Sequence, residues 1–183
     1  MGDVLDDRGL LAVAAAGDRT AFDTLVRRHT PRMYRVALRI VGEAIDAEDV
    51  VQDAWISAWR GLRAYRGDAA PSTWLYRVVS NAALAHLRRR RPTVPLDDIA
   101  ERLSTVDDAD TPERAALRAD EVAAVHRAVA ELDPSQRVPL VLREFEGLSY
   151  EEVAAVLQVS VSAVRSRLHR ARRTLLVTLE GVR

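Results

Sequence analysis

The sequence predicts an all-α protein of two small helical domains joined by an acidic linker, the second containing a helix-turn-helix. Three observations support this fold class. Glycine and proline are few, at 8 and 7 of 183 residues, while the good helix formers alanine and leucine are abundant. Apolar residues recur three and four positions apart, and strand-like alternation is nearly absent. Charged residues form blocks that mark the limits of the domains.

The composition excludes several kinds of site. There is no cysteine, which rules out a disulfide scaffold, a thiol nucleophile and a metal site with cysteine ligands. The 27 basic residues balance 27 acidic residues, and every basic residue is arginine. Arginine is a permanent cation whose planar guanidinium suits phosphate. Nucleic acid can therefore bind locally although the net charge is zero.

The beginning of the sequence predicts a cytoplasmic protein. Residues 1–7 are acidic and lack the basic start and apolar core of a signal peptide. No apolar run approaches the ~20 residues that cross a bilayer, so direct insertion into a membrane is not expected.

A boundary between domains is predicted at residues 92–112. This stretch has two prolines near its start, is rich in aspartate and lacks a sustained apolar period, so a helix is disfavoured there. We predict a first domain over residues 1–91, a linker over 92–112 and a second domain over 113–183.

The first domain contains a predicted helix over residues 46–60, with Asp46 as its N-cap and Gly61 at its end. One side is an apolar stripe made of Val51, Ala54, Trp55 and Ala58. The other side carries Asp49, Gln52, Asp53, Ile56 and Arg60. Two interpretations fit this second side: a solvated surface with one stray isoleucine, or an acidic docking surface for a basic partner helix.

A loop over residues 65–71 and a helix over 72–87 follow, and four arginines come directly after them at 88–91. Exposed aromatic rings beside arginines suit single-stranded nucleic acid, because rings stack on bases and arginines contact phosphates. Alternatively, Trp74 and Tyr76 belong to the core and the arginines only solvate the end of the helix.

The second domain contains two predicted helices separated by a short turn, as is typical of a helix-turn-helix. Ser149 and Glu152 form a capping box for a helix that reaches Leu157, and Ser160 can cap the next helix, which reaches about Leu179. One face of the later helix is apolar, and residues 160–173 contain five arginines, His169 and no acid. This pattern favours insertion into a major groove over an ordinary basic surface helix.

Two further helices are predicted in the second domain, over residues 113–132 and 134–145. Pro139 is expected to kink the second of them or delay its start, because proline lacks the backbone N–H. His169 has no clustered partner ligands, so no metal site is predicted, and nothing indicates a cofactor.

Three stretches, taken in this order, closely resemble the extracytoplasmic-function (ECF) sigma factors of bacterial RNA polymerase. Residues 46–60 resemble the helix that binds core polymerase, and residues 65–81 resemble the loop and helix that open the −10 element. Residues 142–154 and 164–172 resemble the helix-turn-helix that reads the −35 element. The resemblance covers roughly residues 10–180 and implies a promoter-specificity factor rather than an enzyme.

The resemblance also implies roles for individual residues. The residues implied in docking to the clamp helices of the largest polymerase subunit are Asp49, Gln52, Asp53, Ile56 and Trp59. Those implied in capturing and contacting the melted −10 strand are Arg66, Gly67, Asp68, Ala69, Trp74, Arg77 and Asn81. Those implied at the −35 element of promoter DNA are Arg143, Ser149, Tyr150, Arg165, Ser166, Arg167, His169 and Arg170. An anti-sigma factor is a further implied partner, and the linker is expected to thread toward the RNA exit path.

One departure from the family pattern concerns the −35 preference. The family usually has a Gly-Val-Pro-x-Gly-Thr run before the recognition helix, whereas residues 158–163 read Gln-Val-Ser-Val-Ser-Ala here. Loss of the Pro and Gly of that run is tolerable, because Ser160 can cap the recognition helix instead.

Two other classes of function compete with this one. A stand-alone helix-turn-helix regulator would use only residues 113–183 and would leave the first 91 residues without a role. A nucleic-acid enzyme would need carboxylates that converge on a metal, but the acids lie on one outer helix face and in the linker.

Overall fold

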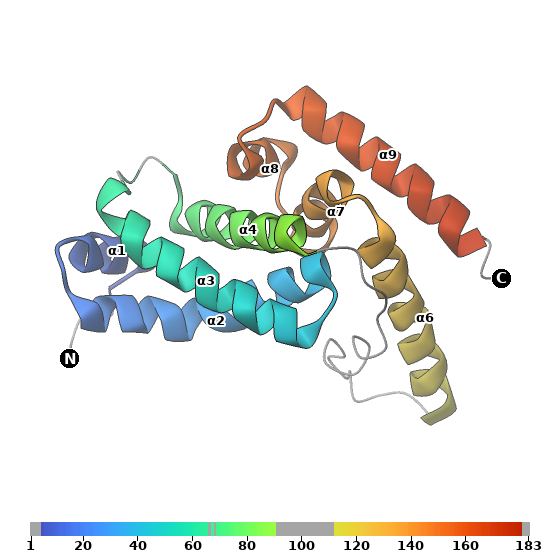
Figure 1. The fold of residues 1–183 in the computed structure, drawn as a ribbon, viewed down its shortest axis with the longest axis horizontal. Helices are drawn as coiled ribbons and strands as arrows, with labels where there is room; N and C mark the ends of the chain where they lie inside the picture. The colour runs from blue at the N-terminus through green and yellow to red at the C-terminus, as the bar shows by residue number, and fades with distance from the viewer. Residues whose placement is uncertain (1–4, 66, 68, 91–111, 181–183) are drawn as a thin grey trace.

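A computed structural model describes residues 5–65, 67, 69–90 and 112–180, and within residues 112–121 only the backbone. The described residues confirm an all-helical protein with two domains (Figure 1). The first has α1 (Asp7–Ala15), α2 (Arg19–Val41), α3 (Ala44–Gly61), the short 3-10 helix η1 (Leu62–Ala64) and α4 (Pro71–Arg89). The second has α6 (Pro112–Glu131), α7 (Pro134–Leu140), the π-helical segment η2 (Val141–Phe145), α8 (Tyr150–Leu157) and α9 (Val161–Glu180). The predicted linker at 92–112 lies almost wholly outside the described residues.

The core of the first domain lies between α2, α3 and α4. The apolar stripe predicted on α3 is buried, because Val51, Ala54, Trp55 and Ala58 all face this core. The Trp55 ring meets the Phe22 ring edge-on at 5.6 Å between centroids, and its Nε1–H donates to the Thr30 hydroxyl at 2.9 Å.

The prediction that Asp46 caps α3 is wrong. The helix begins two residues earlier, and Glu43 stands at the N-cap position without a side-chain hydrogen bond. The Asp46 carboxylate instead accepts a hydrogen bond from Arg90 at the end of α4. A guanidinium is a stronger partner for a carboxylate than a backbone N–H, and Asp46 still lies in the first turn, where the helix dipole favours an anion.

The predicted helix over residues 134–145 consists of two kinds of helix, and the change comes shortly after Pro139. The α-helical pattern of α7 continues through Pro139 to Leu140 and then becomes π-helical in η2. The backbone N–H of Glu146 donates to the Val141 carbonyl, five residues earlier, at 3.2 Å. Such wide turns are frequent at functional sites.

The capping box predicted for the second domain is confirmed. The Ser149 hydroxyl accepts from the Glu152 N–H at 3.1 Å, and the Glu152 carboxylate accepts from the Ser149 N–H at 2.7 Å. Gln158 takes a left-handed conformation, with φ of 54°, to end α8. The Ser160 hydroxyl then accepts from the Ala163 N–H, so the start of α9 is also capped as predicted.

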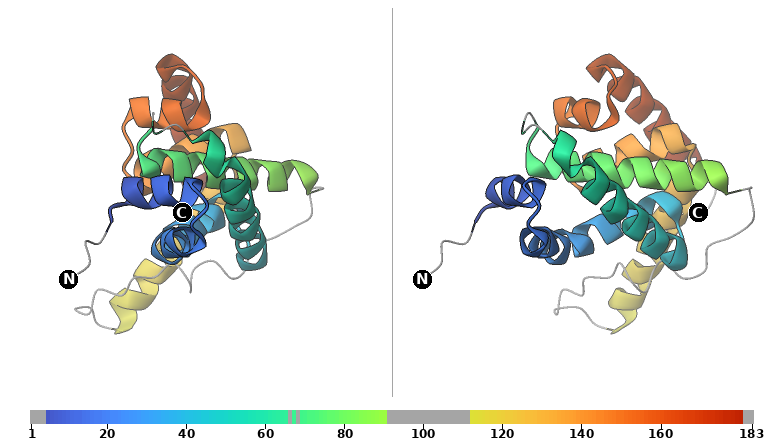
Figure 2. Two further views of the ribbon diagram at one scale, coloured as in Figure 1. Left: turned by 90° about the vertical axis from the view of Figure 1, so that its left-hand side faces the viewer. Right: turned by 60° about the vertical axis from the view of Figure 1, so that its left-hand side comes forward.

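The two domains pack against each other. Figure 2 shows α8 on one side of α4 and the helices α1 to α3 on the other, and α2 also contacts α6, α7 and η2. The buried Arg137 of α7 joins the domains, since it donates to the Ile40 carbonyl of α2 and to the Leu132 carbonyl at the end of α6. Burial lowers the pKa of the Arg137 guanidinium to about 10, so it stays charged at neutral pH.

The buried imidazole of His126 predicts a loss of stability in mild acid. Burial lowers the pKa of His126 in the folded chain, and the nearby Arg39 guanidinium lowers it further. The unfolded chain takes up a proton near pH 6.5, whereas the folded chain resists it. The free energy of unfolding should therefore fall as the pH drops below about 6.5.

Thermal and urea unfolding between about pH 7.5 and pH 5.5 measure this slope around the ordinary histidine pKa. The variant His126→Asn should flatten the slope, and His169→Asn, which removes an exposed histidine, should not. An unchanged slope in His126→Asn would contradict the assignment.

Candidate nucleic-acid interface

The residues predicted to dock a partner lie on the outer side of α3, and the Trp59 ring also contacts the Phe22 ring at 4.9 Å between centroids. Asp49, Gln52 and Asp53 are exposed, and the apolar Ile56 and Trp59 are 43% and 39% exposed. We call these five residues the α3 face. Large apolar side chains on an outer surface beside carboxylates are typical of a protein-binding surface.

Arginines from the end of α4 partly neutralise this region. Arg89 donates to Asp53 at 3.0 Å, and both side chains are at least half exposed. Exposed pairs of this kind contribute little to stability and exchange easily. Arg89 belongs to the arginine block that one interpretation of the sequence assigns to phosphate contacts, and here it is an exchangeable partner of the α3 face.

The described residues among those predicted to contact the −10 strand lie along α4 and in the loop before it. Trp74, Arg77 and Asn81 follow one another at helical spacing, with Trp74 and Arg77 half-buried and Asn81 exposed. The Trp74 ring packs on Tyr65 at 5.3 Å between centroids, and the Tyr65 hydroxyl donates to the Ala69 carbonyl at 2.7 Å. These contacts close the loop around Gly67, whereas Arg66 and Asp68 lie outside the described residues.

Arg77 makes a contact that the sequence did not predict. Its guanidinium donates to the Ala155 carbonyl, in the last turn of α8, at 2.7 Å. Carbonyls at the end of a helix lack partners within the helix and attract cations. The second domain therefore covers a residue predicted to contact the melted −10 strand.

The residues predicted to contact the −35 element are divided between the surface of α9 and its surroundings. Arg165, Ser166, His169 and Arg170 are exposed on α9. Arg167 is half-buried instead and lines a hollow between the domains with Leu84 and Pro139. It lies apart from the other four because its helix position turns toward α4 and α7.

Tyr150 lies between two arginines of the second domain. The guanidinium carbon of Arg143 is 4.9 Å from the centre of its ring, and that of Arg165 is 5.6 Å away. Arg143 also donates to the Leu148 carbonyl at 2.6 Å. Cation–π contacts restrict the rotamers of both arginines, so Tyr150 orients Arg165 near the start of α9.

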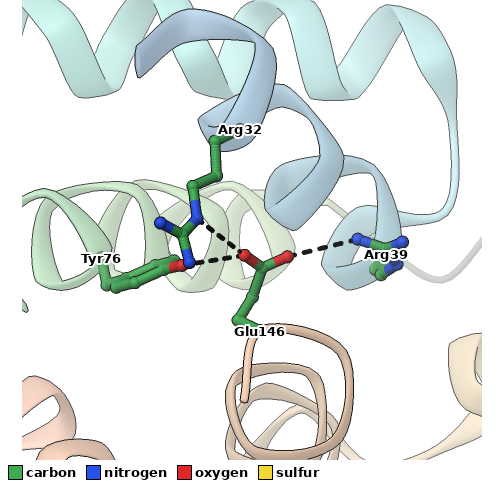
Figure 3. A network of polar contacts seen from close by, with 4 residues as sticks. All are labelled: Arg32, Arg39, Tyr76 and Glu146. Atoms are coloured by element: carbon green, nitrogen blue, oxygen red, sulfur yellow. Dashed lines mark hydrogen bonds and ion pairs between the residues drawn. The ribbon is translucent and has the colours of Figure 1, made fainter. Parts of the chain in front are cut away.

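A network between the domains is the largest feature that the sequence did not reveal. The Glu146 carboxylate, directly after η2, accepts hydrogen bonds from Arg32, Arg39 and Tyr76 at 3.0, 3.3 and 2.8 Å. Figure 3 shows these three side chains, from α2 and α4, pointing toward Glu146. Burial raises the pKa of Tyr76, and its hydrogen bond to Glu146 raises it further, so the hydroxyl stays protonated as a donor.

Neither a metal site nor a membrane-spanning helix is found in the described part of the chain. No group of three or more histidine or acidic side chains there could hold a metal ion. No described helix is long and apolar enough to cross a membrane.

Comparison with known proteins agrees with this arrangement. Residues 25–93 match the family described as Sigma-70 region 2, and residues 123–175 match the one described as Sigma-70, region 4. Both domains of the structure therefore contain a family segment.

Curated relatives align over almost the whole chain. RNA polymerase sigma-H factor of Pseudomonas aeruginosa is 42% identical, with 92% of this chain and 91% of the relative covered. ECF RNA polymerase sigma-E factor of Escherichia coli is 37% identical, with 96% and 95% covered. Among solved structures, that of CnrH in complex with the cytosolic domain of CnrY superposes with a TM-score of 0.69. It is 32% identical, with 96% of this chain and 97% of that chain covered. The chain therefore belongs to the ECF family of RNA polymerase sigma factors, which are not enzymes, and directs the initiation of transcription.

Proposed function

We propose that three surfaces of this chain divide the work of promoter recognition. The α3 face docks the clamp helices of the largest polymerase subunit, α4 with its preceding loop holds the melted −10 strand, and α9 reads the −35 element. The observation that supports this most is the separation of three different chemistries on one chain: acidic with apolar, aromatic with polar, and basic. The phosphodiester chemistry stays in the polymerase.

The arrangement of α8 and α9 supports the proposal that the second domain reads DNA as a helix-turn-helix. Helices α8 and α9 are joined by a short capped turn, and α9 buries Val164, Leu168 and Ala171 against its own domain. The opposite side presents arginines and His169 to the solvent, as a helix in the major groove requires. Ser149 and Tyr150 lie at the start of α8, and Arg143 of η2 reaches the Tyr150 ring there, where all three would contact phosphates.

The linker and the partners complete the proposal. The acidic residues 92–112 would thread toward the RNA exit path, where they would imitate nucleic acid in a basic channel. CnrH is known in complex with the cytosolic domain of CnrY, and by analogy an anti-sigma factor would cover the α3 face. This work would take place in the cytoplasm, where the polymerase is found.

In vitro transcription tests the proposal. Core bacterial polymerase, with and without the protein, is given a pooled genomic template of the host. New discrete transcripts that depend on the protein are expected, and their start sites would reveal the −35 and −10 elements. The absence of both new transcripts and polymerase binding would overturn the proposal.

The double variant Asp53→Arg with Ile56→Ala should reduce affinity for core polymerase at least tenfold, which corresponds to about 1.4 kcal/mol. It reverses one charge and removes one exposed apolar side chain from the α3 face. Binding is measured by fluorescence anisotropy of the labelled protein. Glu131→Arg makes the same charge change on an exposed acid of α6 and should leave the affinity unchanged. Equal affinity of the double variant and the wild type would show that α3 does not dock polymerase.

Arg165→Ala should cost ~1–3 kcal/mol at one position of the −35 element if Arg165 reads a base. The measurement is competition between promoter fragments that carry every base at each −35 position, in the presence of polymerase. Arg173→Ala removes another exposed arginine farther along α9 and serves as the control. A uniform loss across all fragments would make Arg165 a phosphate contact instead.

Two substitutions of Ser149 separate its capping role from its proposed phosphate contact. Ser149→Ala removes the cap and should lower the free energy of unfolding by ~1 kcal/mol. Ser149→Asp retains a good N-cap but adds a negative charge, so it should remain stable and bind promoter DNA more weakly. Unfolding in urea and promoter binding with polymerase are measured on both variants. Wild-type promoter affinity in Ser149→Asp would place Ser149 away from the phosphates.

A further inference from the structure

The network around Glu146 is a complete anion site in which one domain supplies the donors and the other supplies the anion. Arg32 and Arg39 are seven residues apart on one side of α2, and Tyr76 comes from α4. The Glu146 side chain is only 6% exposed, and that of Arg39 only 15%. A buried guanidinium and a buried carboxylate each need a partner, so neither can lose the other without a substitute.

Aromatic rings hold the two arginines of this site in position. The Arg32 guanidinium lies over the Tyr76 ring at 4.9 Å, and that of Arg39 lies over the Phe145 ring at 4.8 Å. The ring under Arg32 belongs to the first domain, so the orientation of the Arg32 guanidinium does not depend on the second domain. A site of two oriented guanidinium groups and a hydroxyl suits a phosphate as well as a carboxylate.

The contact between the domains is incomplete in its hydrogen bonds. Arg77 donates to α8, but its Nε and the Nε of Arg39 are buried without a hydrogen-bond partner. A buried polar group without a partner costs free energy. The closed arrangement thus has a built-in penalty, and separating the domains would relieve it.

We propose that Glu146 is an internal competitor of promoter DNA: it fills a phosphate site formed by Arg32, Arg39 and Tyr76, and a backbone phosphate of the opened strand takes this site when the domains separate. The inference rests on the proposed function, because it extends the −10 surface of α4 to α2. Tyr76 adjoins Arg77 in the sequence, so the site lies next to the proposed strand contacts. A phosphodiester carries the same single negative charge as the carboxylate that it replaces.

The test compares Glu146→Gln with Glu144→Gln in the full chain. Glu144 is a matched control, because it is an exposed acid two residues away that pairs with Arg172 of its own domain at 2.6 Å. The probe is a fluorescent single-stranded DNA 12-mer of mixed sequence. We expect Glu146→Gln to bind it about fivefold more tightly or better, since a larger fraction of the chain is open. Glu144→Gln should bind as the wild type does.

The dependence of DNA affinity on salt concentration distinguishes two causes of tighter binding. One is a new phosphate contact at Arg32, and the other is only the exposure of α4 when the domains separate. Each phosphate contacted on a single strand adds about 0.7 to the slope of log affinity against log salt. Glu146→Gln should steepen this slope, and adding Arg32→Ala should reverse the increase. Adding Arg27→Ala, at an exposed arginine elsewhere on α2, should reverse it less. A gain in affinity that survives Arg32→Ala with an unchanged slope would overturn the phosphate site.

Distances between spin labels report the opening itself. The chain has no cysteine, so labels on Asp23→Cys in α2 and Glu151→Cys in α8 attach only at those two exposed positions. Glu146→Gln should broaden the distribution toward longer distances, and Glu144→Gln should not. An unchanged distribution together with unchanged DNA affinity would overturn the inference. The DNA-binding and distance measurements need no polymerase. Failure of this inference can therefore be distinguished from failure of the proposed function, which would appear as a wild-type protein that does not support transcription.

Discussion

The burial of the Glu146 carboxylate constrains the rest of the structure. A carboxylate that leaves water must recover its lost hydration from charged or hydrogen-bonding partners. Here the partners are Arg32 and Arg39 on α2 and Tyr76 on α4, so one side chain ties the end of η2 to two helices of the other domain. The π-helical turn after Pro139 places Glu146 at that point, and α8 consequently lies on α4. Together with the Arg77 contact to α8, this interaction holds the second domain over the part of α4 that carries Arg77.

Features that depend on neighbours in the chain could be predicted from the sequence. The capping box needs only Ser149 and Glu152 three residues apart, and the buried stripe of α3 needs only apolar residues at helical spacing. The resemblance to sigma factors rests on motifs of the same local kind, and the comparisons bear out the family.

Features that depend on distant partners could not be predicted in this way. Asp46 was expected to cap α3, but Arg90, 44 residues away, takes its carboxylate. Glu146 lies 114 residues from Arg32 and 107 from Arg39. No helical or strand periodicity in the sequence links residues so far apart, because only the packing of the two domains brings them together. The spacing of seven between the two arginines is the one signal that the sequence offered, since it places both on one side of a helix.

The two surfaces proposed to read DNA differ in how the free chain presents them. The exposed arginines of α9 face the solvent, so a duplex can approach them without any rearrangement. Arg77 on α4 is engaged by α8, and its contact must break before a melted strand can use it. A guanidinium cannot serve a carbonyl and a phosphate with the same N–H groups, so closure of the domains and binding of the −10 strand exclude each other at this residue. Under the proposed function, the −35 surface is therefore available first, and the −10 surface becomes available only once the domains have separated.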